Sequence, residues 1–265
     1  MTPCHNSGKF LFRLMDSILG QTYPNIEMIT VDNDSQDDTA EVIKSYIPKF
    51  EKKGYSLTYI KEDDLGPSWA VNNALPFMNG EFIYMPDSDD WLGDLDAIEK
   101  IVNKFEELPE DYAIVRCYGQ QILETDMSKL RVFGKGQPAI SDGNLFEDCL
   151  FAKNGFFYCG VCYAYKMSAV REIIGTSIFA AYNIGQNRQM MLPLLYSRKC
   201  YTIQEPLANY LVRANSICHG EYAKYGVMKE MHKTEEIYID AILATIKEMS
   251  KEQRDFYKSK FLQMG

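Results

Sequence analysis

Hydrophobic positions in the first half of the chain recur at two spacings, one typical of strands and one typical of helices. Leu11, Leu14, Met15, Ile18 and Leu19 share one face of a helical wheel, so this segment is predicted to be an amphipathic helix. Short apolar runs predict strands at 26–31, 56–60, 81–85 and 112–118, and helical spacing predicts further helices at 39–50, 66–78 and 94–108. Strands that alternate with helices predict an α/β fold with a mostly parallel sheet flanked by helices.

The pattern weakens after residue 119. Residues 119–145 are rich in glycine and polar residues, and apolar stretches follow at 145–170 and 189–196. The last segment, 222–265, carries many charges on amphipathic, helix-like spacing. We therefore predict one domain over residues 1–220 and a helical C-terminal extension over residues 221–265.

Composition excludes two classes of protein. Lys and Arg total 28 against 37 Asp and Glu, a formal net charge of −9. A nucleic-acid-binding protein needs a basic surface to neutralise phosphates, so nucleic acid is not an expected partner. No stretch approaches the roughly 20 apolar residues of a membrane span, and no signal peptide opens the sequence.

The seven cysteines are scattered and odd in number, which is typical of reduced thiols in a cytosolic protein. Cys159 and Cys162 form a C-x-x-C pair, but no second pair or nearby histidine completes a zinc site. We interpret both as small buried hydrophobic residues.

Two acidic loops lie where predicted strands end. The first acidic loop is residues 32–38, "DNDSQDD", and the second acidic loop is residues 87–90, "DSDD". Ligands of parallel sheets bind beyond the carboxyl ends of the strands. Asp87 and Asp89, separated by one residue, offer the hard oxygen ligands that suit Mg²⁺ or Mn²⁺. The alternative is a solvated acidic turn, in which Asp90 caps the following helix.

At these positions the sequence resembles the family 2 glycosyltransferases. The segments "TPCHNSGKFLFRLMDSILGQTYPNIEMITVDNDSQDDT", "LGPSWAVNNAL" and "MPDSDDW" are similar, in order and spacing, to family motifs. The resemblance covers about residues 1–220. It implies the Rossmann-like GT-A fold, with a nucleotide-sugar half at about 1–118 and an acceptor half at about 119–220. It also implies sugar transfer from a nucleotide sugar with inversion at the anomeric carbon, assisted by Mn²⁺ or Mg²⁺.

The resemblance carries over to individual positions of this chain. Those implied to bind the nucleotide sugar are Pro3 and His5 beside the base, Asp32 and Asn33 in the base-binding loop, Asp64 and Asn72 near base and ribose, Asp87 and Ser88 at ribose and diphosphate, and Arg213 at the diphosphate. Asp89 is the implied metal ligand, and His219 is a candidate for the metal or a phosphate.

Three departures from the family pattern affect the donor half. The family has an apolar strand before the turn at Pro3, and we expect such a strand upstream of the sequence given. Asn33 replaces an aspartate that accepts a hydrogen bond from uracil; an amide can accept or donate, so uridine fits and cytidine stays open. Val71 stands where the family has an arginine.

A fourth departure concerns the chemistry. Inversion requires a general base, which the family takes from a Glu-Asp pair, but the matching positions here hold Gln186 and Asn187. Neither amide can act as a base, although the resemblance to a "G-Q-N-x-Q" version of this helix keeps both as catalytic candidates. The alternative is that the two amides merely cap a helix whose apolar residues belong to the core. Glu147 and Asp148 are the nearest carboxylates in sequence.

We interpret the chain as a cytoplasmic, metal-dependent inverting glycosyltransferase of the hexosyltransferase class. It would move a sugar from a UDP-sugar to a saccharide or lipid-linked acceptor in surface polysaccharide or cell-wall synthesis. Peripheral association with the inner membrane face and the oligomeric state are left open. The alternative is a catalytically inert homologue that binds nucleotide sugars or acts as a scaffold. A dinucleotide oxidoreductase fits less well, because no G-x-G-x-x-G follows a predicted strand.

Overall fold

A computed structural model describes residues 1–63, 66–139, 145–181, 185–214 and 227–263, with side chains of the segment after 227 described from 235 on. In chain order, the strands are β1 (Thr2–Cys4), β2 (Glu27–Asn33), β3 (Ser56–Glu62), β4 (Phe82–Tyr84), β5 (Trp91–Leu92), β6 (Tyr112–Leu123), β7 (Lys129–Phe133), β8 (Tyr163–Lys166) and β9 (Lys199–Val212). The helices are α1 (Gly8–Leu19), α2 (Thr39–Lys53), α3 (Pro67–Ala74), η1 (Leu75–Phe77), α4 (Ala97–Glu107), α5 (Leu145–Phe151), η2 (Gly160–Cys162), α6 (Met167–Ala169), η3 (Val170–Ile174), α7 (Asn187–Ser197), α8 (Val227–Thr245) and α9 (Lys251–Leu262).

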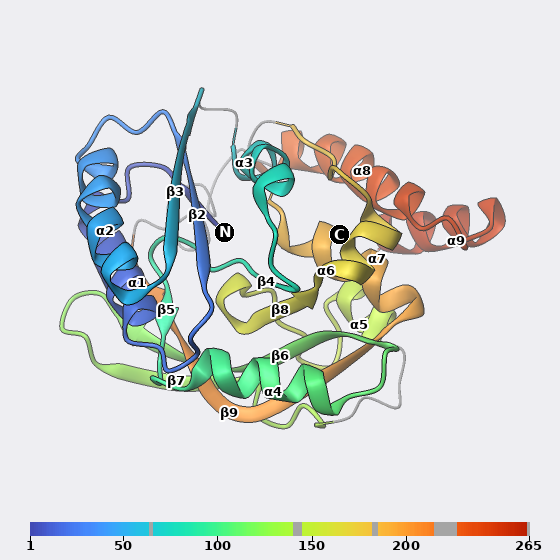
Figure 1. The fold of residues 1–265 in the computed structure, drawn as a ribbon. Coiled ribbons are helices and arrows are strands. Elements are labelled where there is room, and N and C mark those ends of the chain that lie inside the picture. Colours follow the sequence, from blue (N-terminus) through green and yellow to red (C-terminus); the bar gives the residue numbers. More distant parts are fainter. Residues whose placement is uncertain (64–65, 140–144, 182–184, 215–226, 264–265) are drawn as a thin grey trace.

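A small parallel sheet forms the N-terminal side of the molecule. Its strand order is β1–β2–β3, and both pairs are parallel. The helices α1 and α2 lie along one face of this sheet, and α3 lies along the other (Figure 1). The ends of β2 and β3 that carry the predicted nucleotide-binding residues therefore open between α3 and the loop that precedes α1.

A second, mixed sheet of six strands forms the rest of the core. Its order is β4–β8–β6–β9–β5, with β7 paired to β6. The pair β6–β9 is parallel, while the pairs that involve β4, β5, β7 and β8 are antiparallel. The α/β fold is as predicted, but instead of one mostly parallel sheet, parallel pairs are found in the small sheet and in β6–β9. The difference lies where the sequence pattern weakened, because β7, β8 and β9 follow residue 119.

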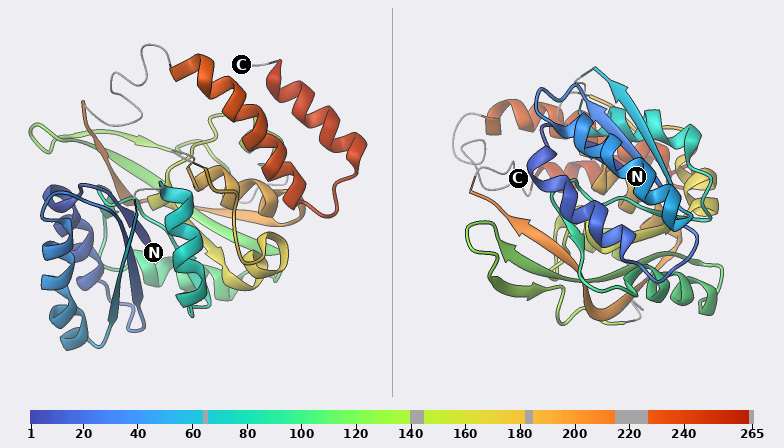
Figure 2. Two further views of the ribbon diagram at one scale, coloured as in Figure 1. Left: turned by 90° about the horizontal axis from the view of Figure 1, so that it is seen from above. Right: turned by 60° about the vertical axis from the view of Figure 1, so that its left-hand side comes forward.

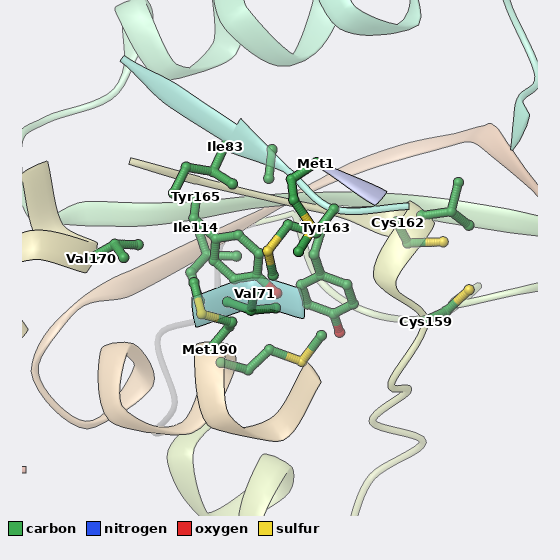
Figure 3. Packing of buried hydrophobic residues seen from close by; sticks show 14 of the residues in the cluster. Met1, Val71, Ile83, Ile114, Cys159, Cys162, Tyr163, Tyr165, Val170 and Met190 are labelled. Atoms are coloured by element: carbon green, nitrogen blue, oxygen red, sulfur yellow. The ribbon is translucent and has the colours of Figure 1, made fainter. Parts of the chain in front are cut away.

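One hydrophobic core joins the two sheets and the helices that cover them. Figure 3 shows Val71 of α3 among Tyr163, Tyr165 and Met190, which come from the second sheet and from α7. Val71 is fully buried, so the residue that replaces the family's arginine serves as a packing residue. Cys159 and Cys162 are buried in the same core, as the sequence predicted. The six cysteines in the described part of the chain are free thiols.

A cavity separates the edges of β2 and β4. The register of β1 with β2 starts at the pair Thr2 and Thr30, so β2 continues for three residues beyond its β1 partner on that side. A cavity of about 550 Å³ lies there, lined by residues that include Met1, Met28 and Tyr84. The expectation of an apolar strand upstream remains a prediction, and this cavity lies in line with the start of β1.

The two C-terminal helices lie side by side against the acceptor half (Figure 2). Tyr257 of α9 contacts Phe146 and Phe151 of α5 through ring-to-ring packing, and α8 packs on α7. The predicted helical C-terminal segment is present, while the domain boundary at residue 220 falls outside the described ranges. Within those ranges, no helix has the length and apolar character needed to cross a bilayer.

Candidate active site

The loop between β1 and α1 is tied to both acidic loops. The His5 ring donates from Nδ1 to the Asn33 carbonyl oxygen over 2.7 Å, which fixes the end of β2. Ser7 Oγ and Ser88 Oγ lie 2.7 Å apart and share a hydrogen bond, which fixes the second acidic loop. Pro3 lies in β1 beside Val31. The structure thus brings Pro3, His5, Asn33 and Ser88 together at one edge of the fold.

Asp32 is committed to holding the first acidic loop. Its Oδ1 accepts from the backbone N–H of Ser35 over 3.0 Å, and its Oδ2 accepts from the Tyr59 hydroxyl over 2.9 Å. The side chain is 1% exposed. Because both carboxylate oxygens are engaged within the protein, Asp32 shapes the loop and presents its neighbour Asn33, whose Oδ1 is buried without a hydrogen-bond partner.

The carboxylates of the second acidic loop have too few donors. The only side-chain donor to Asp87 in the described ranges is Gln186 Nε2, at 3.4 Å from Asp87 Oδ1. Burial, and then the charge of Asp89, raises the pKa of Asp87 to about 6, although the hydrogen bond from Gln186 acts in the opposite direction. Removing charged oxygens from water without full compensation is costly, so this loop favours a cation nearby.

Asp89 forms an ion pair with Arg213, and their closest atoms are 2.6 Å apart. Both side chains are about one-quarter exposed or less. The Arg213 guanidinium also lies over the Phe10 ring, 4.5 Å from its centroid. The predicted metal ligand and the predicted diphosphate-binding cation therefore meet directly, at the end of β9.

Asp90 does not cap the following helix, so that prediction is wrong. The helix α4 begins three residues later than expected, with Asp96 at its N-cap. Asp90 instead points into the protein, where Oδ1 accepts from the Leu211 N–H over 2.9 Å, and Oδ2 is buried without a partner. Burial, together with the charges of Asp89 and Asp87, raises its pKa well above the ordinary value. It locks the loop to β9.

The start of α7 faces the second acidic loop across a glycine. A Cβ added at Gly160 would lie 2.6 Å from the Met85 carbonyl oxygen, 3.1 Å from Asn187 Oδ1 and 3.7 Å from Asp87 Oδ2. Asn187 Oδ1 is buried without a hydrogen-bond partner. The predicted catalytic amides thus lie beside Asp87, and only a residue without a side chain lets the 159–162 turn approach them.

The remaining predicted residues are placed as follows. Asn72 donates from Nδ2 to the Ile178 carbonyl oxygen and accepts from the Ile178 N–H, over 2.9 and 2.8 Å. These two bonds hold the 178 segment, which makes Asn72 a positioning residue in this structure. Asp64 and His219 lie outside the described residues.

Glu147 and Asp148 turn away from the second acidic loop. Glu147 lies 3.5 Å from Lys260 Nζ of α9, and Asp148 accepts from the Asn154 side chain over 2.8 Å. Both contacts lie on the side of α5 that meets α9 and the loop after α5. Neither carboxylate is placed to take a proton beside Asn187.

Asp87 and Asp89 are the side chains that could hold a divalent cation. Their oxygens are the hard ligands that Mn²⁺ and Mg²⁺ take, and the buried Asp90 Oδ2 beside them has no hydrogen-bond partner. In the described ranges, no three His, Cys, Asp or Glu side chains converge closely enough to enclose a metal by themselves. These carboxylates therefore fit a cation that completes its shell with water and phosphate oxygens, as Mg²⁺ does.

Sequence reasoning missed two residues of the site. Gly160 was read as part of a C-x-x-C pair, and nothing in the pattern shows that its turn would touch Met85 and Asn187. Glu62 ends β3 directly beside Asn33, its register partner on β2. A charged residue at a strand end is an ordinary feature, so only the strand pairing reveals this neighbour.

Known proteins resemble this chain in sequence. The model described as "Glycosyl transferase family 2" matches residues 1–174. TuaG of Bacillus subtilis, a glycosyltransferase assigned to teichuronic acid biosynthesis, is 26% identical over 224 residues, which cover 84% of this chain and 81% of TuaG. The glycosyltransferase GlyA of Streptococcus pneumoniae is 33% identical over 118 residues, 44% of this chain. The matches span only 16% of GlyA and 38% of its relative GlyG.

Solved structures share the fold. TarS of Staphylococcus aureus in complex with UDP-GlcNAc superposes with a TM-score of 0.72 at 15% identity, covering 99% of this chain and 70% of that one. A mannosyltransferase of Pyrobaculum calidifontis in complex with GDP-Man and Mn²⁺ gives a TM-score of 0.60 at 15% identity, with 99% and 71% covered. At such identities the likeness shows the fold, which is the GT-A fold that the sequence predicted.

Proposed function

Because this chain belongs to glycosyl transferase family 2, we propose that it transfers a sugar from a UDP-sugar to a saccharide or lipid-linked acceptor in surface polysaccharide or cell-wall synthesis. The observation that carries the proposal is the placement of the second acidic loop between the loop that precedes α1 and the start of α7, through the contacts of Ser88 with Ser7 and of Asp87 with Gln186. Relatives named for teichuronic and teichoic acid biosynthesis support the class of product, and TarS in complex with UDP-GlcNAc supports the donor.

The donor would lie along the edge formed by β1, β2 and the second acidic loop. Asn33 would read the base beside Pro3 and His5, Asp87 and Ser88 would meet the ribose and diphosphate, and Arg213 would neutralise part of the diphosphate charge. The sugar would then reach the start of α7. Asn187 Oδ1, buried and without a partner, is a ready acceptor for a sugar or acceptor hydroxyl.

Asp89 would hold a divalent cation, Mn²⁺ or Mg²⁺, with Asp87 in support. Such a cation offsets the charge of the diphosphate and stabilises the leaving nucleotide. Arg213 would then exchange its contact with Asp89 for one with the diphosphate. The chain's own side chains would orient the donor and exclude water from the anomeric carbon.

The proton of the acceptor hydroxyl has to leave without a carboxylate from α7. Gln186 and Asn187 are amides and bind no proton at neutral pH, while Glu147 and Asp148 are engaged elsewhere. We propose that the two amides orient the acceptor and that a donor phosphate oxygen or water takes the proton. The transfer would be inverting, and it would take place in the cytoplasm, at the inner membrane face where the acceptor is lipid-linked.

A melting-temperature screen with nucleotide sugars, with and without Mn²⁺, tests the donor. A ligand that binds the native state at 100 times its Kd adds about 2.7 kcal/mol of stability, which raises the melting temperature measurably. UDP-sugars with Mn²⁺ should give the largest rise. A protein that responds to no nucleotide sugar would contradict the proposal.

Asn187→Ala tests the site at α7. It should lower turnover about 10-fold or more, with UDP affinity unchanged, because losing a buried hydrogen bond that orients the acceptor costs about 1–3 kcal/mol. Ser197→Ala, at the far end of the same helix, is the matched control for folding. Wild-type turnover in Asn187→Ala would mean that the start of α7 has only a structural role. Asn187→Asp should raise donor hydrolysis, since it supplies a carboxylate.

A catalytically inert homologue is the second candidate, and the amides at Gln186 and Asn187 favour it. It predicts tight UDP binding with no hydrolysis or transfer, for the wild type and for Asn187→Asp alike. Anomeric proton signals of the product, followed by NMR, separate the two candidates and report inversion directly.

A further inference from the structure

Two buried oxygens belong to neighbouring residues at the ends of β2 and β3, and neither has a hydrogen-bond donor. They are Asn33 Oδ1 and Glu62 Oε1. The two residues are register partners in neighbouring parallel strands, whose chains run about 4.8 Å apart, so their side chains project from the same face. An unsatisfied buried acceptor costs about 1–3 kcal/mol, and here two such costs fall on adjacent groups.

Both side chains are held where they are by other contacts. The Asn33 backbone carbonyl accepts from His5 over 2.7 Å, and the residue is 3% exposed. Glu62 Oε2 accepts from Asn73 Nδ2 of α3, the helix that covers this face of the sheet. Burial, and then the charge of Asp63, raises the pKa of Glu62 to about 7. In its ionised form, above that pKa, Glu62 is a carboxylate that needs one more donor on Oε1.

The asparagine can supply that donor. The two ends of its amide have the same shape, so the hydrogen bonds decide which end points where. We propose that Glu62 orients the Asn33 amide, with Nδ2 donating to Glu62 Oε1 and Oδ1 turned toward the nucleotide base. That hydrogen bond satisfies the buried carboxylate, and a donor on the nucleotide base would then satisfy Asn33 Oδ1. Glu62 is a positioning residue in this arrangement.

The consequence is a choice of base, and it rests on the proposed function. With Oδ1 toward the base, Asn33 accepts from an N–H. Uracil offers a donor at N3, whereas cytosine presents a lone pair there, which would face the Asn33 oxygen. An aspartate at this position would accept without help, but an asparagine needs a neighbour to fix its orientation. Glu62 thus makes an asparagine behave as an acceptor and selects uridine over cytidine.

Titration calorimetry with UDP and CDP, in the presence of Mn²⁺, tests the assignment. The wild type should prefer UDP by about 10- to 100-fold, the effect of one satisfied against one opposed hydrogen bond in a buried site. In Glu62→Gln, the new amide can accept from or donate to Asn33, so both orientations become available and the preference should fall to about threefold or less. Asp63→Asn removes a neighbouring, exposed carboxylate and should keep the wild-type preference.

The double variant Asn33→Asp with Glu62→Gln is the rescue. Its carboxylate at 33 can only accept, so uridine preference should return. A Glu62→Gln protein that keeps the wild-type UDP-to-CDP ratio, or that loses affinity for both nucleotides equally, would overturn the inference while leaving the proposed function in place. A wild type that binds neither nucleotide would overturn both.

The wild-type protein offers an independent measurement, should Glu62→Gln fail to fold. One side-chain amide proton of Asn33 should exchange slowly with solvent, because Glu62 holds it in a buried hydrogen bond. NMR exchange spectra of the wild type, with the signal assigned through the backbone resonances of Asn33, report this directly. Rapid exchange of both amide protons would overturn the inference.

Discussion

The two acidic loops look alike in sequence and differ in how their carboxylates are satisfied. In the first, Asp32 accepts from Ser35 and Tyr59, and Asp37 accepts from the Thr39 hydroxyl and N–H and from the Gly8 N–H. Burial opposes ionisation of Asp37, but these hydrogen bonds together lower its pKa below the ordinary value. The carboxylates of Asp32 and Asp37 are therefore satisfied without a ligand.

The second loop is left incomplete. Asp87 and Asp90 both have raised pKa values, chiefly through burial and then through the charges of neighbouring aspartates. Asp90 Oδ2 has no partner, and the strongest cationic contact goes to Asp89. A carboxylate with several donors is stable when ionised, whereas a buried one without them is not. The first acidic loop therefore shapes the site, and the second presents carboxylates that a cation would neutralise.

The largest effect should come from Asp89→Asn. We expect turnover to fall about 100-fold or more, because a metal supplies several kcal/mol of transition-state stabilisation, and the Mn²⁺-dependent part of UDP binding to disappear. Asp94→Asn, which alters an exposed acid outside the loop, is the control. Calorimetry with UDP and Mn²⁺ measures the change. An unchanged Mn²⁺ dependence would place the cation elsewhere.

Asp32→Ala should act on folding rather than on the cation. It leaves the Ser35 N–H and the Tyr59 hydroxyl without an acceptor, at a cost of about 2–4 kcal/mol in the free energy of unfolding. Asp34→Asn, which removes the charge of a carboxylate paired with Lys61 and keeps a residue that tolerates the positive φ of this position, should change it by about 0.5 kcal/mol or less. Urea denaturation compares the two. A loss below about 1 kcal/mol for Asp32→Ala would show that the carboxylates of the first loop are no better satisfied than those of the second.

Asp90→Asn should change the free energy of unfolding in the opposite direction and stabilise the protein. The amide keeps an oxygen for the Leu211 N–H and removes a buried charge next to Asp87 and Asp89, so the metal-free protein should gain about 1 kcal/mol in free energy of unfolding. The urea midpoint without divalent cations measures this. A destabilised variant would mean that the negative charge of Asp90 is compensated in the fold.

Asp37→Ala should give the smallest change, a loss of about 0.5–1 kcal/mol, typical of a carboxylate that accepts at a helix start. Because the folded pKa of Asp37 is lowered, its contribution is present at pH 7 and is lost as the pH falls through that pKa, below about 4. The difference from wild type should therefore shrink as the pH falls below about 4. Asp38→Ala is the control, since Asp38 makes no side-chain cap hydrogen bond. A pH-independent difference would argue for packing instead.

Sequence patterning predicted the first half of the fold well, because its strands are short and flanked by clear helices. Beyond residue 119 it failed for a physical reason. The pairing of β6 with β9 shifts register on both sides of Tyr118, and such irregularities break the alternation on which strand prediction depends. No local pattern shows the direction in which a strand runs, so the antiparallel pairs of this sheet could not be predicted.

The chain's residue types and their spacing determined the family, the α/β class, the two acidic loops and the amides at Gln186 and Asn187, because motifs and periodicity are local properties of the sequence. Which carboxylates are satisfied is a different matter. The donors to Asp32 and Asp90 come from Tyr59 and Leu211, far away along the chain. The tertiary structure alone decided this, because hydrogen bonding and burial depend on which distant segments pack together.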